Sequence, residues 1–134
     1  MIQRIQSIWL LSVVACAVLS FFLPFAYSAE GGSLVGLTAQ SHWYLFLLTL
    51  AIGLASLIVI FLYHDRKLQL TVCTYTCLAT FGLLAIYVVK TMNFPKIGPS
   101  LFCLFVAAMP IFMIMSIRAI RKDMKMLEES DRLR

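Results

Sequence analysis

Four apolar runs divide the 134-residue chain, and short polar segments separate them. Each run is long enough to cross the hydrocarbon core of a bilayer, which takes about 20 residues of helix. The runs occupy residues 5–25, 43–63, 68–89 and 101–120. Together they leave no room for a separate soluble domain. The pattern therefore predicts an all-α fold, an integral membrane four-helix bundle that forms a single domain over residues 1–134.

The segments between the runs predict how the helices are joined. Residues 64–67 form a connection of only four residues, so the second and third spans should pair as an antiparallel hairpin. The longest connection, residues 26–42, contains a predicted turn at residues 30–33. An apolar stretch after that turn is expected to lie on the lipid headgroups or to fold over the bundle.

The apolar pattern does not stop where the fourth run ends. Ile117, Ile120, Met124 and Leu127 continue it at steps of three and four residues. This spacing is typical of one face of a helix. We therefore predict that the tail, residues 121–134, is a helical extension of the fourth span on the cytoplasmic side.

The charges predict an orientation in the membrane. Only 13% of the residues are charged, about half the share usual in soluble domains. The net charge is +5, and nine of the 11 lysines and arginines fall on the side of the two termini: Arg4, Arg66, Lys67, Arg118, Arg121, Lys122, Lys125, Arg132 and Arg134. Cytoplasmic segments carry such an excess of lysine and arginine, so both termini should be cytoplasmic. The first run is also longer than the core of a secretory signal, which favours an uncleaved anchor.

Several functional classes find no support in the sequence. None of the four runs contains an acidic residue, whereas ion-coupled transporters usually place an ionisable group inside the membrane. Patterns of serine hydrolases and of nucleotide or phosphate binding are missing from the sequence. The basic residues form no extended face with interleaved aromatics, so nucleic acid is not an expected partner. We expect no enzymatic activity, no cofactor and no metal site.

Small and weakly polar residues recur on one face of each run. They are Ser12, Cys16, Ser20, Gly53, Ser56, Thr76, Thr80 and Ala107. We interpret them as helix-packing faces, because small residues let helices approach closely in lipid. The alternative is a polar path, which would make the protein a small oligomeric channel or transporter.

The two ends of the chain resemble a known family. The matching segments are Met-Ile-Gln-Arg-Ile-Gln-Ser at residues 1–7, Arg-Lys-Leu-Gln at 66–69, Arg-Ala-Ile-Arg-Lys-Asp at 118–123 and Ser-Asp-Arg-Leu-Arg at 130–134. They are similar to a family of small four-span Bacteroidetes membrane proteins that is known only as a domain of unknown function. The resemblance implies a bacterial inner-membrane location, but it supplies no reaction and no ligand.

Ordered charges at both ends suggest a docking surface. The candidate docking residues are Gln3, Arg4, Gln6, Arg118, Arg121, Lys122, Asp123, Asp131, Arg132 and Arg134. Positive charge alone would be enough to orient the protein in the membrane, whereas these segments mix positive and negative residues. Our first hypothesis is therefore a scaffold or accessory subunit of a larger membrane complex. Its expected partners are the lipid bilayer and other membrane proteins or a second copy of itself.

Overall fold

A computed structural model describes residues 2–30, 33–93 and 97–134. It contains four helices, α1 (Ile2–Phe22), α2 (Trp43–Phe61), α3 (Arg66–Asn93) and α4 (Cys103–Arg132). Three short strands accompany them, β1 (Ala26–Glu30), β2 (Ser33–Leu37) and β3 (Ile97–Pro99). All four helices are long and apolar enough to cross a membrane. The predicted all-α four-helix bundle is confirmed.

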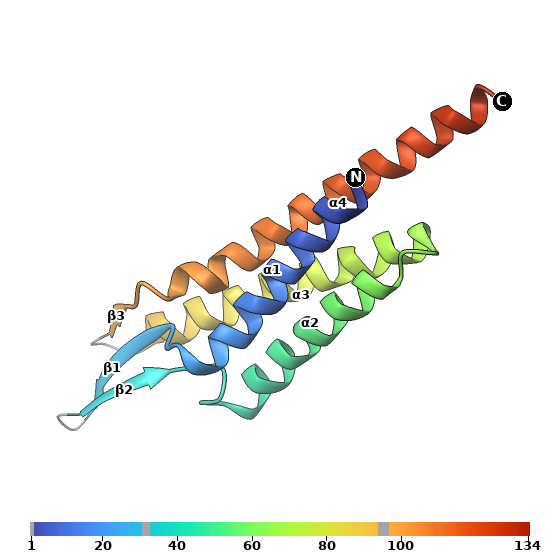
Figure 1. The fold of residues 1–134 in the computed structure, drawn as a ribbon. Coiled ribbons are helices and arrows are strands. Elements are labelled where there is room, and N and C mark those ends of the chain that lie inside the picture. Colours follow the sequence, from blue (N-terminus) through green and yellow to red (C-terminus); the bar gives the residue numbers. More distant parts are fainter. Residues whose placement is uncertain (1, 31–32, 94–96) are drawn as a thin grey trace.

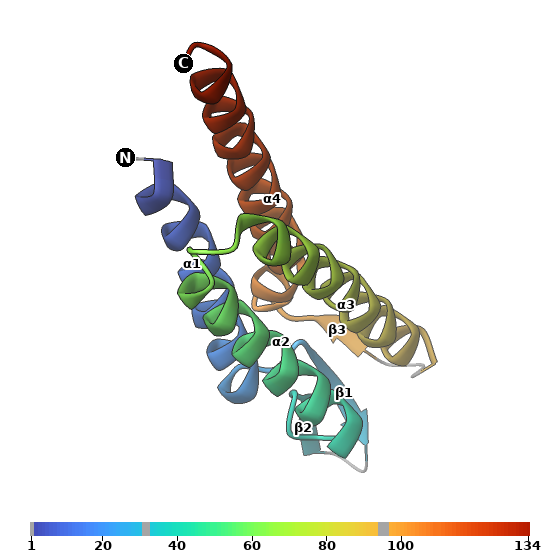
Figure 2. The same cartoon turned by 90° about the vertical axis from the view of Figure 1, so that its right-hand side faces the viewer.

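The helices run antiparallel to their neighbours in a closed ring (Figures 1 and 2). α1 packs against α2 and α4, and α3 packs against the same two helices. α1 begins and α4 ends at the same end of the bundle, which we call the terminal end, and the strands lie at the opposite sheet end (Figure 1). α4 has 30 residues, about 45 Å of helix, and it extends past the other helices at the terminal end (Figure 1).

The core follows a heptad pattern in every helix. Steps of three and four residues alternate through the main buried positions: Gln6, Leu10, Val13, Ala17 and Ser20 in α1; Leu45, Thr49, Ile52, Ser56 and Val59 in α2; Gln69, Cys73, Thr76, Thr80, Leu83 and Tyr87 in α3; and Val106, Met109, Met113, Ser116 and Ile120 in α4. We call each of these rows a seam. Such spacing is that of knobs-into-holes packing in helical bundles, so the four seams meet in one continuous core.

The first helix ends earlier than the apolar run that predicts it. α1 stops at Phe22, although the backbone N–H of Leu23 still donates to the carbonyl of Leu19. Pro24 has no N–H and cannot continue the helical hydrogen bonds. The chain leaves the helix at this point and enters the sheet.

The strands form a small antiparallel sheet in the order β2-β1-β3. β1 and β2 lie in the connection between α1 and α2, whereas β3 lies between α3 and α4. The sheet therefore joins the two connections at the sheet end. The sequence analysis did not predict these strands, and Gly31 and Gly32 of its predicted turn lie outside the described residues.

Phe25 attaches the sheet to the bundle. Its N–H donates to the carbonyl of Leu37 (2.7 Å), and its carbonyl accepts from the N–H of Ser100 (3.0 Å). Its ring stacks on that of Tyr87 in α3, with 4.7 Å between the centroids. Phe25 and Tyr87 are both buried. The sheet thus closes the core at this end.

We expect Gly36→Ala to destabilise the attachment of the sheet. A Cβ atom at position 36 would lie 2.8 Å from the Cβ of Pro24, which is closer than such atoms pack. Overpacking of this kind costs about 1–3 kcal/mol. Gly98→Ala is the matched control, because it lies in the same sheet and its Cβ would meet nothing within 4 Å.

Thermal unfolding in detergent micelles checks this prediction. Gly36→Ala should lower the midpoint, and Gly98→Ala should leave it near that of the wild type. Equal midpoints for the two variants would contradict a tight contact between β2 and Pro24.

Candidate functional site

Four buried hydroxyl groups inside the bundle bond to their own helices. Four buried side chains donate to a carbonyl three or four residues earlier: Ser20 to Ala17 (2.7 Å), Ser56 to Ile52 (2.8 Å), Thr76 to Val72 (2.8 Å) and Thr80 to Cys77 (2.7 Å). Since each of these four hydroxyl protons is used locally, none of the four is presented to a solute. Thr49 and Ser116 are also buried in the seams, but their hydroxyls have no hydrogen-bond partner among the described residues.

The residues of the predicted packing faces do not all share one environment. Cys16, Ser20, Ser56, Thr76 and Thr80 are buried. Ser12, Gly53 and Ala107 are half-buried. The seams advance by alternating steps of three and four residues, so a face defined by steps of four drifts away from the core. Ser12 has drifted in this way, and its hydroxyl donates to the carbonyl of Ile8 (2.9 Å).

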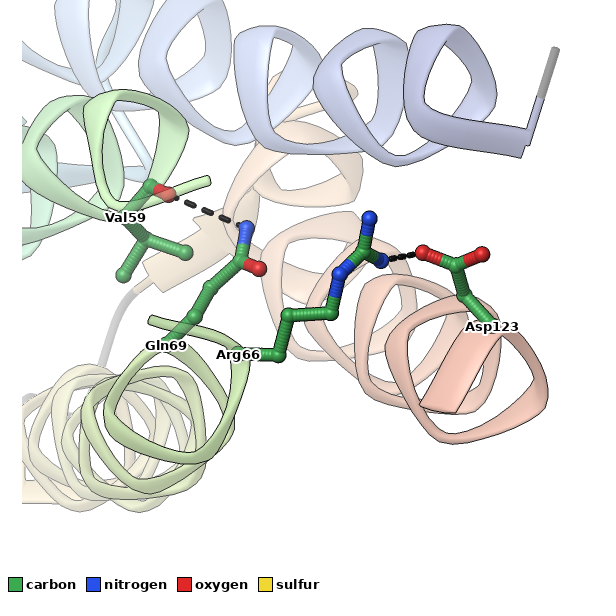
Figure 3. Close-up of polar contacts among 4 residues, drawn as sticks. All are labelled: Val59, Arg66, Gln69 and Asp123. Atoms are coloured by element: carbon green, nitrogen blue, oxygen red, sulfur yellow. Dashed lines mark hydrogen bonds and ion pairs between the residues drawn. The ribbon is translucent and has the colours of Figure 1, made fainter. Parts of the chain in front are cut away.

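Gln69 ties α3 to α2 near the terminal end. Its side-chain amide donates to the backbone carbonyl of Val59 at 3.1 Å (Figure 3). α2 ends at Phe61, and the last four carbonyls of a helix have no partner within it. Gln69 satisfies one of these carbonyls. An unpaired carbonyl in this buried position would be unfavourable.

Arg66 ties α3 to α4 by an ion pair with Asp123 (Figure 3). The two side chains are 20% and 14% exposed. Asp123 follows Ile120 by three residues, so it occupies the next position of the α4 seam. The ion pair forms the last layer of the bundle at the terminal end. Asp123, a predicted docking residue, is engaged within the chain.

A groove begins immediately beyond this layer. It has a volume of about 450 Å³ and lies between the α2–α3 turn and the extension of α4. The turn contributes His64, Asp65, Arg66 and Lys67, and α4 contributes Met124, Leu127, Glu128 and Asp131. We call it the terminal groove. It combines two apolar side chains with charged groups of both signs.

The basic residues of α4 lie on another side of this helix. Arg118, Arg121, Lys122, Lys125 and Arg132 are all exposed. At about 100° per residue, they cluster about a third of a turn from the residues that line the terminal groove. We call them the basic flank. Within one short segment of α4, the basic side chains therefore lie on a different side of the helix from the groove.

The remaining predicted docking residues lie in different surroundings. Arg4 and Arg134 are exposed. Gln6 is buried at 3% exposure, and its amide nitrogen has no hydrogen-bond partner within the described part of the chain. Gln3 lies in α1, but its side chain is outside the described residues. No group of three His, Cys, Asp or Glu side chains suited to a metal ion occurs among the described residues.

The sequence analysis missed half of the terminal groove. It grouped Met124 and Leu127 on one helical face, but it did not connect them to the turn at residues 64–67. Only the packing of α3 against α4 brings the two segments together.

Comparisons with known proteins identify a family but no characterised relative. Residues 2–133 match the family described as a domain of unknown function, DUF4293. The match covers nearly the whole chain and confirms the resemblance to a family of unknown function. No curated protein and no solved structure matches the chain.

We expect the loss of either partner of the Arg66–Asp123 pair to destabilise the bundle. Arg66→Gln or Asp123→Asn would leave one charge without its partner in a largely buried layer. The cost should be about 1–3 kcal/mol, between the values for surface and fully buried pairs. The double variant should lose less than the two single losses combined.

Thermal unfolding in micelles measures these losses. Asp131→Asn serves as the control, because Asp131 is exposed and forms no ion pair within the described residues. Strictly additive losses in the double variant would show that Arg66 and Asp123 do not stabilise each other.

Proposed function

We propose that the chain, which belongs to the DUF4293 family of unknown function, is a non-enzymatic scaffold or accessory subunit in the bacterial inner membrane. It docks other membrane proteins at its terminal end. The terminal groove is the observation that carries this proposal. There, an apolar floor lies beside charged groups of both signs, past the apolar run of residues 101–120.

The orientation of the protein supports a cytoplasmic docking site. Nine of the 11 lysines and arginines belong to the terminal end. Segments with such an excess of positive charge stay on the cytoplasmic side during insertion. The basic flank would then face anionic headgroups, and the terminal groove would open at the level of the membrane surface.

The core argues for docking over transport. Its seams contain large side chains that are almost inaccessible, such as Leu10, Leu45, Leu83 and Met113. Four hydroxyls that could line a polar path are buried in this core and bonded to their own helices, those of Ser20, Ser56, Thr76 and Thr80. A channel along these faces would require the four seams to separate.

Leu127 is the residue from which docking is best tested. It lines the terminal groove and is 49% exposed. The adjacent Met126 has the same exposure but does not line the groove. The two positions therefore form a matched pair for a photo-reactive amino acid, introduced into the protein at its native level in intact cells.

We expect irradiation to attach one discrete protein at position 127 and none, or far less of it, at position 126. The reason is that a docked segment must cover the floor of the groove. Mass spectrometry of the purified adduct identifies the partner. Adducts of equal yield at both positions, or lipid adducts alone, would contradict a docking role for the terminal groove.

A further inference from the structure

We propose that the terminal groove selects a cationic amphipathic segment, namely the juxtamembrane helix of a partner protein in the same membrane. This inference rests on the docking function proposed above and specifies the chemistry of the partner. It follows from the charges of the groove, from its apolar floor and from its position at the membrane surface.

The groove is locally acidic in a basic protein. Three carboxylates line it, those of Asp65, Glu128 and Asp131. The charge of Arg66 is already neutralised by Asp123. Their contact is the sole ion pair among the described residues. Lys67 is the one remaining cation of the lining when His64 is neutral. The lining therefore carries an excess of negative charge, although the whole chain carries +5.

Orientation and lipid binding do not account for these carboxylates, although Glu128 also lies beside Lys125 and Arg132 in an adjoining pocket. The chain has only six acidic residues, and half of them line this one groove. Acidic residues contribute little to the orientation of membrane proteins. Near anionic headgroups they are unfavourable, because like charges repel. A cationic partner gives the three carboxylates an attractive interaction instead.

Membrane proteins supply such a cationic segment on the cytoplasmic side. Their juxtamembrane segments there are rich in lysine and arginine for the same reason that orients this chain. A partner helix leaving the bilayer beside α4 would bring its basic side chains to the level of Asp65 and Asp131. Because both proteins lie in the same membrane, the partner's basic segment reaches the groove without a long linker between that segment and its membrane span.

The floor of the groove fits the apolar side of such a helix. Met124 is half-buried and Leu127 is exposed, and both line the groove. From Met124 to Asp131 the lining extends about 10 Å along α4, or two helical turns. Methionine adapts its shape to different apolar surfaces. Amphipathic helices bind grooves of this kind through a few apolar residues on one face.

The test uses the full chain in nanodiscs of zwitterionic phosphatidylcholine, which offers no anionic lipid to a cationic peptide. The probe is a fluorescent amphipathic helix of leucine and lysine, about five turns long. A second probe replaces every lysine with glutamate. Fluorescence anisotropy, corrected with empty nanodiscs, measures the affinity of each probe.

We expect the lysine probe to bind and the glutamate probe not to bind. The triple variant Asp65→Asn, Glu128→Gln, Asp131→Asn should weaken the lysine probe by about tenfold, as the loss of three exposed ion pairs implies. Asparagine is chosen at position 65 because it is as favourable as aspartate just before a helix. Glu129→Gln is the matched control: Glu129 is exposed, adjacent to Glu128 and outside the groove lining.

Three results would overturn the inference: equal binding of both probes, unchanged affinity in the triple variant, or an equal loss in Glu129→Gln. The thermal midpoint of each variant shows that it is folded.

In cells, a partner adduct at position 127 that persists undiminished in the triple variant would overturn charge selection and leave docking intact. An adduct between two copies of this chain would overturn the partner assignment. The absence of any protein adduct in the wild type would overturn docking itself.

Discussion

The packing of four helices along heptad-spaced seams determines which side chains remain free for other roles. In lipid, helices are held together by close contacts and hydrogen bonds, because the hydrophobic effect does not drive them together. Each seam therefore takes small and polar residues into the core along with large apolar ones. Ser56 and Thr80 bond to their own helices there. The hydroxyls engaged in this way are therefore not free to bind a solute.

The terminal end of the core is closed by side chains that could not lie deeper in the bilayer. An aspartate at a seam position in the membrane centre would be strongly unfavourable. Asp123 lies at the last layer, where Arg66 neutralises it, and Gln69 satisfies a carbonyl of α2 close by (Figure 3). Beyond this layer α4 continues alone (Figure 1). Its seam residues then have no partner helix, and Leu127 becomes exposed. The groove thus results from one helix being longer than its neighbours.

The sequence predicts the features that depend on local periodicity. The four apolar runs indicate the helices, and the spacing of Met124 and Leu127 indicates that α4 continues past the membrane. The sheet depends on a pairing between β1 and β3, which lie about 70 residues apart in the chain. Gly31 and Gly32 between two five-residue segments are a hairpin signal, but Gly98 and Pro99 favour a loop over a strand. The third strand exists because β1 provides a partner for it.

The candidate site was only partly predictable for a similar reason. A helical projection groups Asp131 with Met124 and Leu127, but no local pattern shows that the turn at residues 64–67 faces them. The order of charges in the tail drew attention to Arg118, Arg121 and Lys122, which lie on the basic flank and not in the groove. Gln6 resembled a surface residue by its polarity. Its position four residues before Leu10 makes it the first member of the α1 seam, and its side chain is buried.

Orientation in the membrane does not explain why the basic flank of α4 and the carboxylates of the groove lie on different sides of the helix. Positive residues alone would fix the topology and attract anionic headgroups, and the basic flank is sufficient for both. Glu128 and Asp131 reduce that attraction, yet they lie together on the side that faces Asp65 across an apolar floor. The other carboxylates of α4 are placed differently, since Asp123 pairs with Arg66 and Glu129 lies outside the groove lining. The position of Glu128 and Asp131 is understandable if one side of α4 contacts lipid and the other contacts a cationic protein segment.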